Sequence, residues 1–247
     1  IDTALPGASS LEVVSLMYVM VILALFVVHI PPRSHTHQDP PPAMGTALRY
    51  LSVFWHSVPL RSSTVTSTLA YAGIAGLVVA APLLGADLAG QSGTGALLLA
   101  VVACGALSGS IAMARWPVRV DPMVTVVVGT LALGAGLGLL ALSPAMWWAF
   151  PAAFLLGITQ APQLAAVMQL RDRESPGHAR ALVFSAASSA KTAAFAFGSL
   201  LAAALVTLGW RELLWGSAVI EFVAVAAGWL VARRRFATPR VEDTHSE

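Results

Sequence analysis

The stretch PPRSHTHQDPPPAMGTALRYLSVFWHSVPLRSS, residues 31–63, decides the organisation of this chain. It is polar and rich in proline, a composition that favours an extended linker over a packed element. One apolar run precedes it and six follow, each close to the roughly 20 residues that a helix needs to cross a bilayer. Because lipid offers no partner to open backbone groups, the sequence predicts an all-α polytopic membrane protein with seven transmembrane helices. The runs lie at residues 11–30, 64–86, 95–114, 122–142, 148–169, 181–208 and 212–232.

The composition excludes a water-soluble fold. Hydrophobic residues make up 57% of the chain and charged residues 11%, whereas soluble domains carry about 25% charged residues. The net charge is +2, but the basic residues lie beside apolar runs and form no contiguous patch, so nucleic acid is not expected as a partner. Membrane lipid is the expected surrounding.

The cationic side chains are distributed asymmetrically about the apolar runs. Of the 14 Lys and Arg residues, 12 lie in four polar gaps that fall on one side if every run crosses the membrane. Since Lys and Arg prefer the cytoplasmic face, we expect residue 1 outside and the last residue inside a cell (plasma) membrane. Arg211 lies in a turn on the opposite side, and Lys191 lies inside an apolar run. The 12 are Arg33, Arg49, Arg61, Arg115, Arg119, Arg171, Arg173, Arg180, Arg233, Arg234, Arg235 and Arg240.

The tryptophans agree with this orientation, because Trp favours the interfaces between membrane and water. Trp116 and Trp229 are expected at the inner interface. The outer interface is expected to hold Trp147, Trp148, Trp210 and Trp215.

The linker divides the chain into four parts. We expect an outer amino-terminal end and first transmembrane helix at 1–30, a cytoplasmic linker at 31–63, a six-helix transmembrane bundle at 64–232 and a cytoplasmic tail at 233–247. Within the linker, residues 48–60 have the pattern of an amphipathic helix on the inner membrane surface. Residue 1 is Ile, and no basic segment precedes the first run, which predicts a chain cut from something longer.

Two polar segments carry motifs. Residues 109–117, GSIAMARWP, hold Gly109 and Arg115 in a short inner loop. Residues 169–180, QLRDRESPGHAR, form an Arg-rich turn with a proline before a helix of small residues. With one run before the linker and six after it, the chain resembles the carboxyl-terminal half of a major facilitator superfamily transporter. The first segment is similar to the family's Gly-x-x-x-Asp-Arg-x-Gly-Arg signature, but Met113 occupies the acidic position.

The resemblance implies a fold and a function. The six runs after the linker would be spans seven to twelve, a bundle of two inverted three-helix repeats, and residues 11–30 would be span six. The protein would be a secondary active transporter of a small organic solute, efflux-like, whose amino-terminal six-helix half is missing here. Gly109 and Arg115 would belong to its conformational inner loop. Import versus export and the coupling ion stay open.

Lys191 and Glu221 are the two ionisable residues near the middle of predicted spans. They lie about 15 Å and 14 Å from the ends of their helices at 1.5 Å per residue. A charge at the centre of a helix costs about 2.5–3.5 kcal/mol to insert, so we expect the two side chains to approach each other. Such a pair is either a substrate- or proton-linked site or a structural lock between two helices. Ser185, Ser188, Ser189 and Thr192 form a polar stripe on the Lys191 helix, with Lys191 at its shoulder.

Other polar positions are weaker candidates. Gln160 and Gln163 lie one turn apart around Pro162 and either contact a solute or form a hydrogen bond between helices. Tyr71 is a further candidate for the cavity wall. Asp87 is expected to be solvated, and Cys104 to be a small buried residue. The polar loops show no metal cluster, phosphate loop or nucleophile–base pair, so no cofactor, metal site or enzymatic activity is expected.

A complete seven-helix receptor or photoreceptor is the alternative. The outside-first orientation and a buried lysine fit it. A retinal-binding lysine is expected on the last of seven helices, however, and Lys191 lies on the sixth, in a helix of mostly Ala and Ser. A membrane-embedded enzyme is a third class, which lacks an acid–base constellation.

Overall fold

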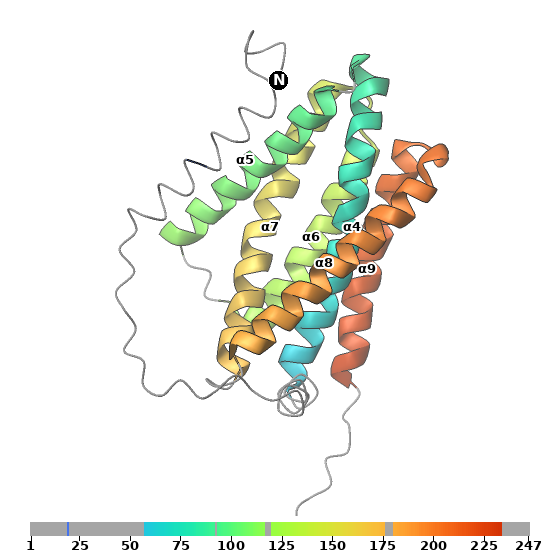
Figure 1. Cartoon of the computed structure of the whole chain (residues 1–247). Coiled ribbons are helices and arrows are strands. Elements are labelled where there is room, and N and C mark those ends of the chain that lie inside the picture. Colours follow the sequence, from blue (N-terminus) through green and yellow to red (C-terminus); the bar gives the residue numbers. More distant parts are fainter. Residues whose placement is uncertain (1–18, 20–56, 92, 117–119, 176–179, 234–247) are drawn as a thin grey trace, which may run out of the picture. The chain divides into compact units, whose positions relative to one another are not determined.

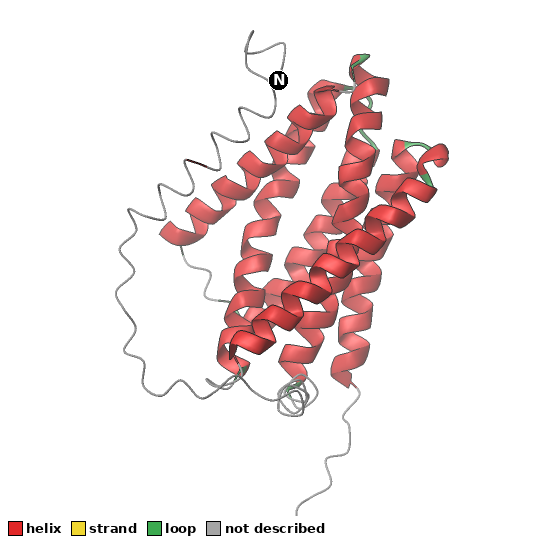
Figure 2. Ribbon diagram, in the orientation of Figure 1, coloured by secondary structure: helices red, strands yellow, loops and turns green. Residues whose placement is uncertain are grey.

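The computed structural model of the chain describes residue 19 and residues 57–91, 93–116, 120–175 and 180–233. These residues form helices joined by short connections, with no strand among them (Figures 1 and 2). Six of the helices are long and apolar enough to cross a membrane. They are α4 (Val58–Ala89), α5 (Gly93–Arg115), α6 (Pro122–Ala141), α7 (Met146–Glu174), α8 (Arg180–Ala204) and α9 (Trp210–Arg233), with a short 3-10 helix η1 (Val206–Leu208) before α9.

The predicted spans coincide with these helices, apart from three differences at helix ends. One is the end of α7, which lies at Glu174, five residues beyond the predicted end at 169. α4 begins six residues before the predicted start at 64, because Ser57 accepts a hydrogen bond from the Leu60 amide at 3.3 Å and Pro59 occupies the first turn. Residues 58–60, the last three of the predicted surface helix 48–60, therefore belong to α4. The run 181–208 is not one helix, since α8 ends at Ala204 and η1 follows. The predicted first span (11–30), the linker up to residue 56 and residues 234–247 lie outside the described residues, apart from residue 19.

α4 is the central helix of the bundle, because it packs against each of the other five. The remaining major contacts join α5 to α7, α6 to α7 and α6 to α9. Exchanging the first three helices with the last three maps these major pairs onto one another. The α4–α9 pair becomes α7–α6, the α4–α8 pair becomes α7–α5, and the α6–α9 pair is unchanged. Two triplets, α4 to α6 and α7 to α9, thus pack by the same rule.

Small residues set the close helix contacts, as is usual where lipid supplies no hydrophobic drive between helices. Gly76 of α4 faces the Ser217 side chain of α9, and Gly228 of α9 faces Thr66 of α4. Gly157 of α7 lies against the backbone of α5. The glycines of α6 also serve packing: a Cβ on Gly138, for example, would meet the Trp215 ring at 3.2 Å.

Hydrogen bonds tie α4 to α9 at both ends. The Arg61 Nη2 donates to the Val231 carbonyl at 2.8 Å, and the Trp210 indole donates to Asp87 Oδ2 at 2.8 Å. Arg61 and Trp210 are both buried. Arg61, predicted to lie in the linker, therefore belongs to α4. Asp87 is exposed, as predicted, and also accepts the hydrogen bond from Trp210.

Candidate functional site

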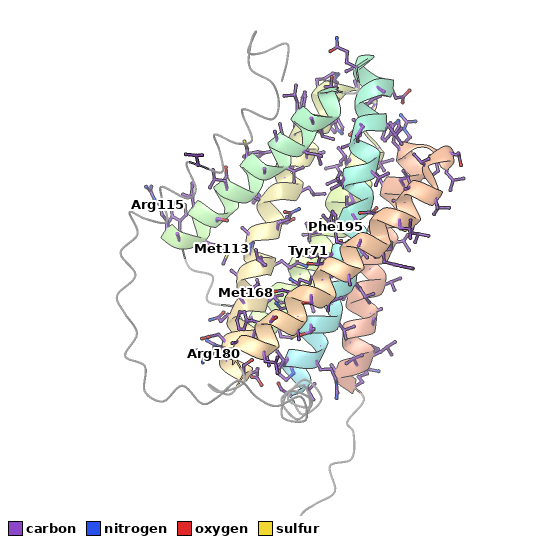
Figure 3. All side chains as sticks on the ribbon, in the orientation of Figure 1. Tyr71, Met113, Arg115, Met168, Arg180 and Phe195 are labelled. Atoms are coloured by element: carbon purple, nitrogen blue, oxygen red, sulfur yellow. The ribbon has the colours of Figure 1, made fainter. Side chains whose placement is uncertain are left out.

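Lys191 lies on the buried face of α8. That face repeats every three to four residues through Ala187, Lys191 and Gly198 and packs against α4. Only 7% of Lys191 is exposed, and its Nζ lies 4.7 Å from the centroid of the Tyr71 ring. The ammonium therefore sits over an aromatic face that attracts cations. Figure 3 shows Tyr71 on the side of α4 that faces α8.

Glu221 is fully buried on a different side of α4. The residue is 0% exposed, and its two carboxyl oxygens have no hydrogen-bond partner among the described residues. A Cβ built on Gly73 of α4 would lie 2.7 Å from Glu221 Oε1, and one on Gly134 of α6 would lie 3.1 Å from Glu221 Cβ. The carboxyl group therefore fills the junction of α4, α6 and α9.

The predicted approach of Lys191 and Glu221 is wrong. The ion pair within the described ranges joins Arg180 and Asp172 at 3.1 Å and includes neither residue. The reason is the packing order, since α8 and α9 follow each other in sequence but both pack on α4. Lys191 meets α4 at Tyr71 and Glu221 meets it at Gly73. Residues that are two positions apart on a helix point in directions about 200° apart. The body of α4 therefore separates the Lys191 ammonium from the Glu221 carboxyl group.

Arg171 is a buried cation that the sequence reasoning missed. It belongs to α7, is 0% exposed, and its Nε, Nη1 and Nη2 atoms have no hydrogen-bond partner among the described residues. It had been counted with the loop cations because it stands in the polar run 169–180. The helical period would have found it, because it follows buried Val167 by four residues and buried Gln163 by eight.

Tyr71, Arg171 and Lys191 form what we call the basic cluster. Arg171 interacts electrostatically with both Lys191 and Tyr71. The geometry of the helices brings the two cations together, because side chains lean toward the amino-terminal end of their own helix. Arg171 stands near the end of α7 and leans back toward the middle of the bundle. Lys191 stands in the middle of α8 and leans toward the end of the bundle at which Arg171 lies.

The hydroxyl stripe of α8 borders this cluster. Ser185, Ser188, Ser189 and Thr192 are all exposed on the described bundle. The Thr192 hydroxyl donates to the Ser188 carbonyl at 3.1 Å. Lys191 is turned inward from this stripe, as its predicted place at the shoulder requires.

Gln163 makes the bond between helices that was one of its two predicted roles. Its Nε2 donates to the Thr130 Oγ1 of α6 at 2.7 Å, and the Thr130 hydroxyl donates to the Val126 carbonyl at 2.8 Å. Gln163 and Thr130 are buried, whereas Gln160 is half-buried. The structure thus assigns Gln163 to the α6–α7 contact.

Gly109 and Arg115 lie apart from the basic cluster. Both belong to α5, where a Cβ on Gly109 would lie 2.6 Å from the Ile158 carbonyl of α7. Arg115 is exposed at the free end of α5, well away from Tyr71 in the view of Figure 3. Cys104, predicted to be buried, is exposed on the same helix.

A groove of about 390 Å³ lies between α6 and α7, also outside the basic cluster. Val124, Val128 and Pro162 are among the residues that line it, and no charged residue does so. Across the described ranges, the structure gathers no group of three or more His, Cys, Asp or Glu side chains that could hold a metal.

Comparisons with known proteins agree with this architecture. A family model described as Major Facilitator Superfamily matches residues 64–246. A comparison with curated proteins gives no match. Among solved structures, the chain is similar to a bacterial homolog of the human lysosomal transporter Spinster in an inward-facing, unoccupied conformation, with a TM-score of 0.54 and 18% identity.

That similarity covers 90% of this chain and 58% of the solved transporter. At such identity the likeness shows the fold alone, and the chain spans little more than half the length of that protein. The family model, by contrast, covers most of the chain. The six helices and the matched residues 64–246 show that this chain belongs to the Major Facilitator Superfamily.

Proposed function

We propose that this chain supplies the carboxyl-terminal half of a secondary active transporter for a small organic solute, completed by an amino-terminal six-helix half. Family membership supports a membrane transporter and not an enzyme. The 58% coverage of the solved transporter supports the assignment as a half. Efflux is the direction that we favour, and the cell membrane is the proposed location.

The observation that carries this proposal is the contrast between exposed helix faces. α6 and α9 expose apolar side chains suited to lipid, including Val124, Val128, Phe222 and Leu230. The first half of α8 instead exposes its hydroxyl stripe, with Lys191 just inside it, whereas its second half exposes Phe197 and Leu200. Hydrocarbon offers a hydroxyl group no hydrogen-bond partner, so turning hydroxyl groups toward lipid is unfavourable. We infer that the stripe faces an aqueous pathway between the two halves.

The mechanism follows from two bundles that rock about a site near the middle of the membrane. The exchange pattern of helix contacts supports two three-helix repeats. Because each repeat crosses the membrane three times, the second repeat would begin on the opposite side from the first and so be inverted. In this scheme Tyr71, Gln160, Ser188 and Lys191 line the pathway. Glu221 lies behind α4 and is either a coupling group for protons or a structural carboxyl.

The orientation is also part of the proposal. The distribution of Arg and Lys supports an outer amino terminus, with linker 31–63 and tail 233–247 on the cytoplasmic side. In that arrangement Gly109 and Arg115 lie toward the inner loop after the second described span. Because Met113 replaces the acidic residue of the signature, a latch built on that acid would be absent from this loop.

The seven-helix receptor is the less favoured function. Lys191 is held against Tyr71 by a cation–π contact, and the family match covers the six helices after the linker. Both observations favour a transporter half.

The exposed stripe can be tested by thiol labelling. Ser188→Cys, in the full-length protein with Cys104→Ala, is expected to react with a membrane-impermeant methanethiosulfonate, because only a hydrated cysteine forms the reactive thiolate. Phe222→Cys is the matched control, because Phe222 is also exposed in the bundle and lies near the middle of α9 on its apolar face. Labelling is measured from both sides of the membrane.

We expect Ser188→Cys to react at least tenfold faster than Phe222→Cys. Equal, slow reaction at both positions would place the stripe in lipid and contradict the proposed pathway.

A further inference from the structure

We propose that the basic cluster binds the anionic group of the transported solute, so that the substrate is a small organic anion carrying a carboxylate or a phosphate. This inference rests on the proposed transport function and specifies its substrate class. It is carried by two buried cations that face one region of the bundle, one of which has no hydrogen-bond partner among the described residues.

The first step concerns the charge of the cluster. Arg171 keeps its proton under all ordinary conditions, and its three side-chain nitrogens are unpartnered within the described part of the chain. A buried guanidinium of this kind is expensive unless an acceptor with negative charge reaches it. Lys191 adds a second cation, whose repulsion makes the arrangement costlier still. An anion between them removes both costs.

The second step concerns the carboxylates of the bundle, which are engaged elsewhere. Asp172, next to Arg171 in sequence, pairs with Arg180 at 3.1 Å. Glu174 accepts a hydrogen bond from the Ser57 hydroxyl at 2.5 Å. Glu221 lies against Gly73, on the other side of α4. The protein itself therefore supplies neither cation with an ion pair in the described ranges.

The third step concerns the neighbouring groups on α4. Thr64 and Thr68 stand seven and three residues before Tyr71, so all three share one face of the helix. The Oγ1 atoms of both threonines are buried, and no described residue forms a hydrogen bond with either of them. A guanidinium grips two oxygens of a carboxylate or phosphate in a fork, while an ammonium attracts them as a point charge. With hydroxyl donors beside them, the two cations make a set suited to oxyanions.

The hydroxyl stripe gives the route to this set. Lys191 lies one turn from exposed Ser188 and beside exposed Thr192, so a solute in the proposed pathway meets the ammonium first. Arg171 is closed off in this conformation. It engages the anion once the Lys191 ammonium has moved off the Tyr71 ring toward the incoming charge.

The test measures ligand protection of the purified full-length protein in a neutral detergent. Benzoate and inorganic phosphate are the anionic probes, and tetramethylammonium chloride at equal ionic strength is the control. A ligand that binds only the native state raises Tm, and we expect a saturable rise of roughly 5 to 10 °C with at least one anion near saturation. Tetramethylammonium chloride should leave Tm unchanged.

The variants assign that rise to the cluster. Lys191→Met and Arg171→Gln are expected to lose at least nine-tenths of it, while Lys191→Arg, which keeps the charge, retains part of it. Arg115→Gln, at the exposed end of α5, is the matched control and should respond like the parent. If Arg171→Gln does not fold, Lys191→Met and Lys191→Arg still decide the outcome.

Three results would overturn the inference. They are no anion-specific rise in the parent protein, an equal rise in Lys191→Met, and protection by phosphatidylglycerol without protection by either soluble anion, which would make the occupant a lipid headgroup. The labelling of Ser188→Cys does not depend on these cations. A hydrated stripe with no anion response would therefore overturn the substrate class and leave the proposed transport function standing.

Discussion

At the scale of single residues, the buried ionisable groups differ in what offsets their cost. A charge at the centre of a membrane helix costs about 2.5–3.5 kcal/mol, and a desolvated cation–π contact contributes about 2 kcal/mol. The Tyr71 ring, 4.7 Å from Lys191 Nζ, thus offsets much of the cost of that ammonium. In the described ranges, Arg171 makes no cation–π contact. Arg171 is therefore the residue at which an incoming anion would gain most.

The contact between Glu221 and Gly73 gives a prediction at this scale. Gly73→Ala would place a methyl group 2.7 Å from Glu221 Oε1, so we expect a loss of about 1–3 kcal/mol of stability from overpacking. Glu221→Ala would leave a void. The double variant should be more stable than the sum of the two losses, because the new methyl group occupies part of the space that the carboxyl leaves.

A double-mutant cycle of unfolding in mixed micelles measures this coupling. Additive losses would show that Gly73 and Glu221 are not in contact. Gly90→Ala cannot serve as the control, because Gly90 has a φ of 68°. Gly93→Ala can, since a Cβ there meets nothing within 4 Å.

At the scale of helices, the sequence predicted the bounds of the elements well and their neighbours poorly. The six described spans follow from hydropathy because each helix must match the thickness of the bilayer by itself. The pairing of Lys191 with Glu221 required knowledge of which helices touch. It failed because α4 lies between α8 and α9. Arg171 was missed for a related reason, because its polar neighbours in the sequence hid its place on the buried face of α7.

The glycine contacts between helices give a second prediction. Gly157→Ala and Gly198→Ala would each drive a methyl group into backbone, at Val102 of α5 and Ala72 of α4 respectively. We expect each to cost about 1–3 kcal/mol of stability. Gly216→Ala is the matched control, since a Cβ there meets nothing within 4 Å. It should be neutral or up to about 1 kcal/mol more stable, because Ala favours helix over Gly.

Thermal unfolding in detergent compares the three variants. If Gly157→Ala and Gly198→Ala unfold at the same temperature as Gly216→Ala, the close helix contacts of the two triplets do not limit stability.

At the scale of the whole molecule, the two triplets share one packing rule. The first helix of each triplet packs against the second and third helices of the other: α4 against α8 and α9, and α7 against α5 and α6. In the proposed function, the polar stripe of α8 marks the side of the bundle that faces the pathway, and the apolar faces of α6 and α9 mark the sides that face lipid. Sequence patterning indicated the stripe through its helical period. It could not indicate which surfaces stay exposed, because exposure depends on the neighbours of each helix.

The proposed orientation can be checked with two exposed tryptophans. Trp147 and Trp116 are 70% and 73% exposed and lie at opposite ends of the predicted spans. In a Cys104→Ala background, Trp147→Cys should react with an impermeant thiol reagent in intact cells, and Trp116→Cys only after permeabilisation. The reverse pattern would invert the topology and contradict the assignment from the Arg and Lys residues.

The position of α4 has a mechanical consequence. Tyr71 and Gly73 are about 3 Å apart along its axis and face opposite ways, toward α8 and toward α9. A solute that pushes on Tyr71 cannot shift α4 sideways toward α9, because the space beside Gly73 is too small even for a methyl group. α4 must either rotate about its own axis or move together with α9. In both cases, an event at the basic cluster reaches the Glu221 carboxyl through one rigid body, with no chain of polar contacts between them.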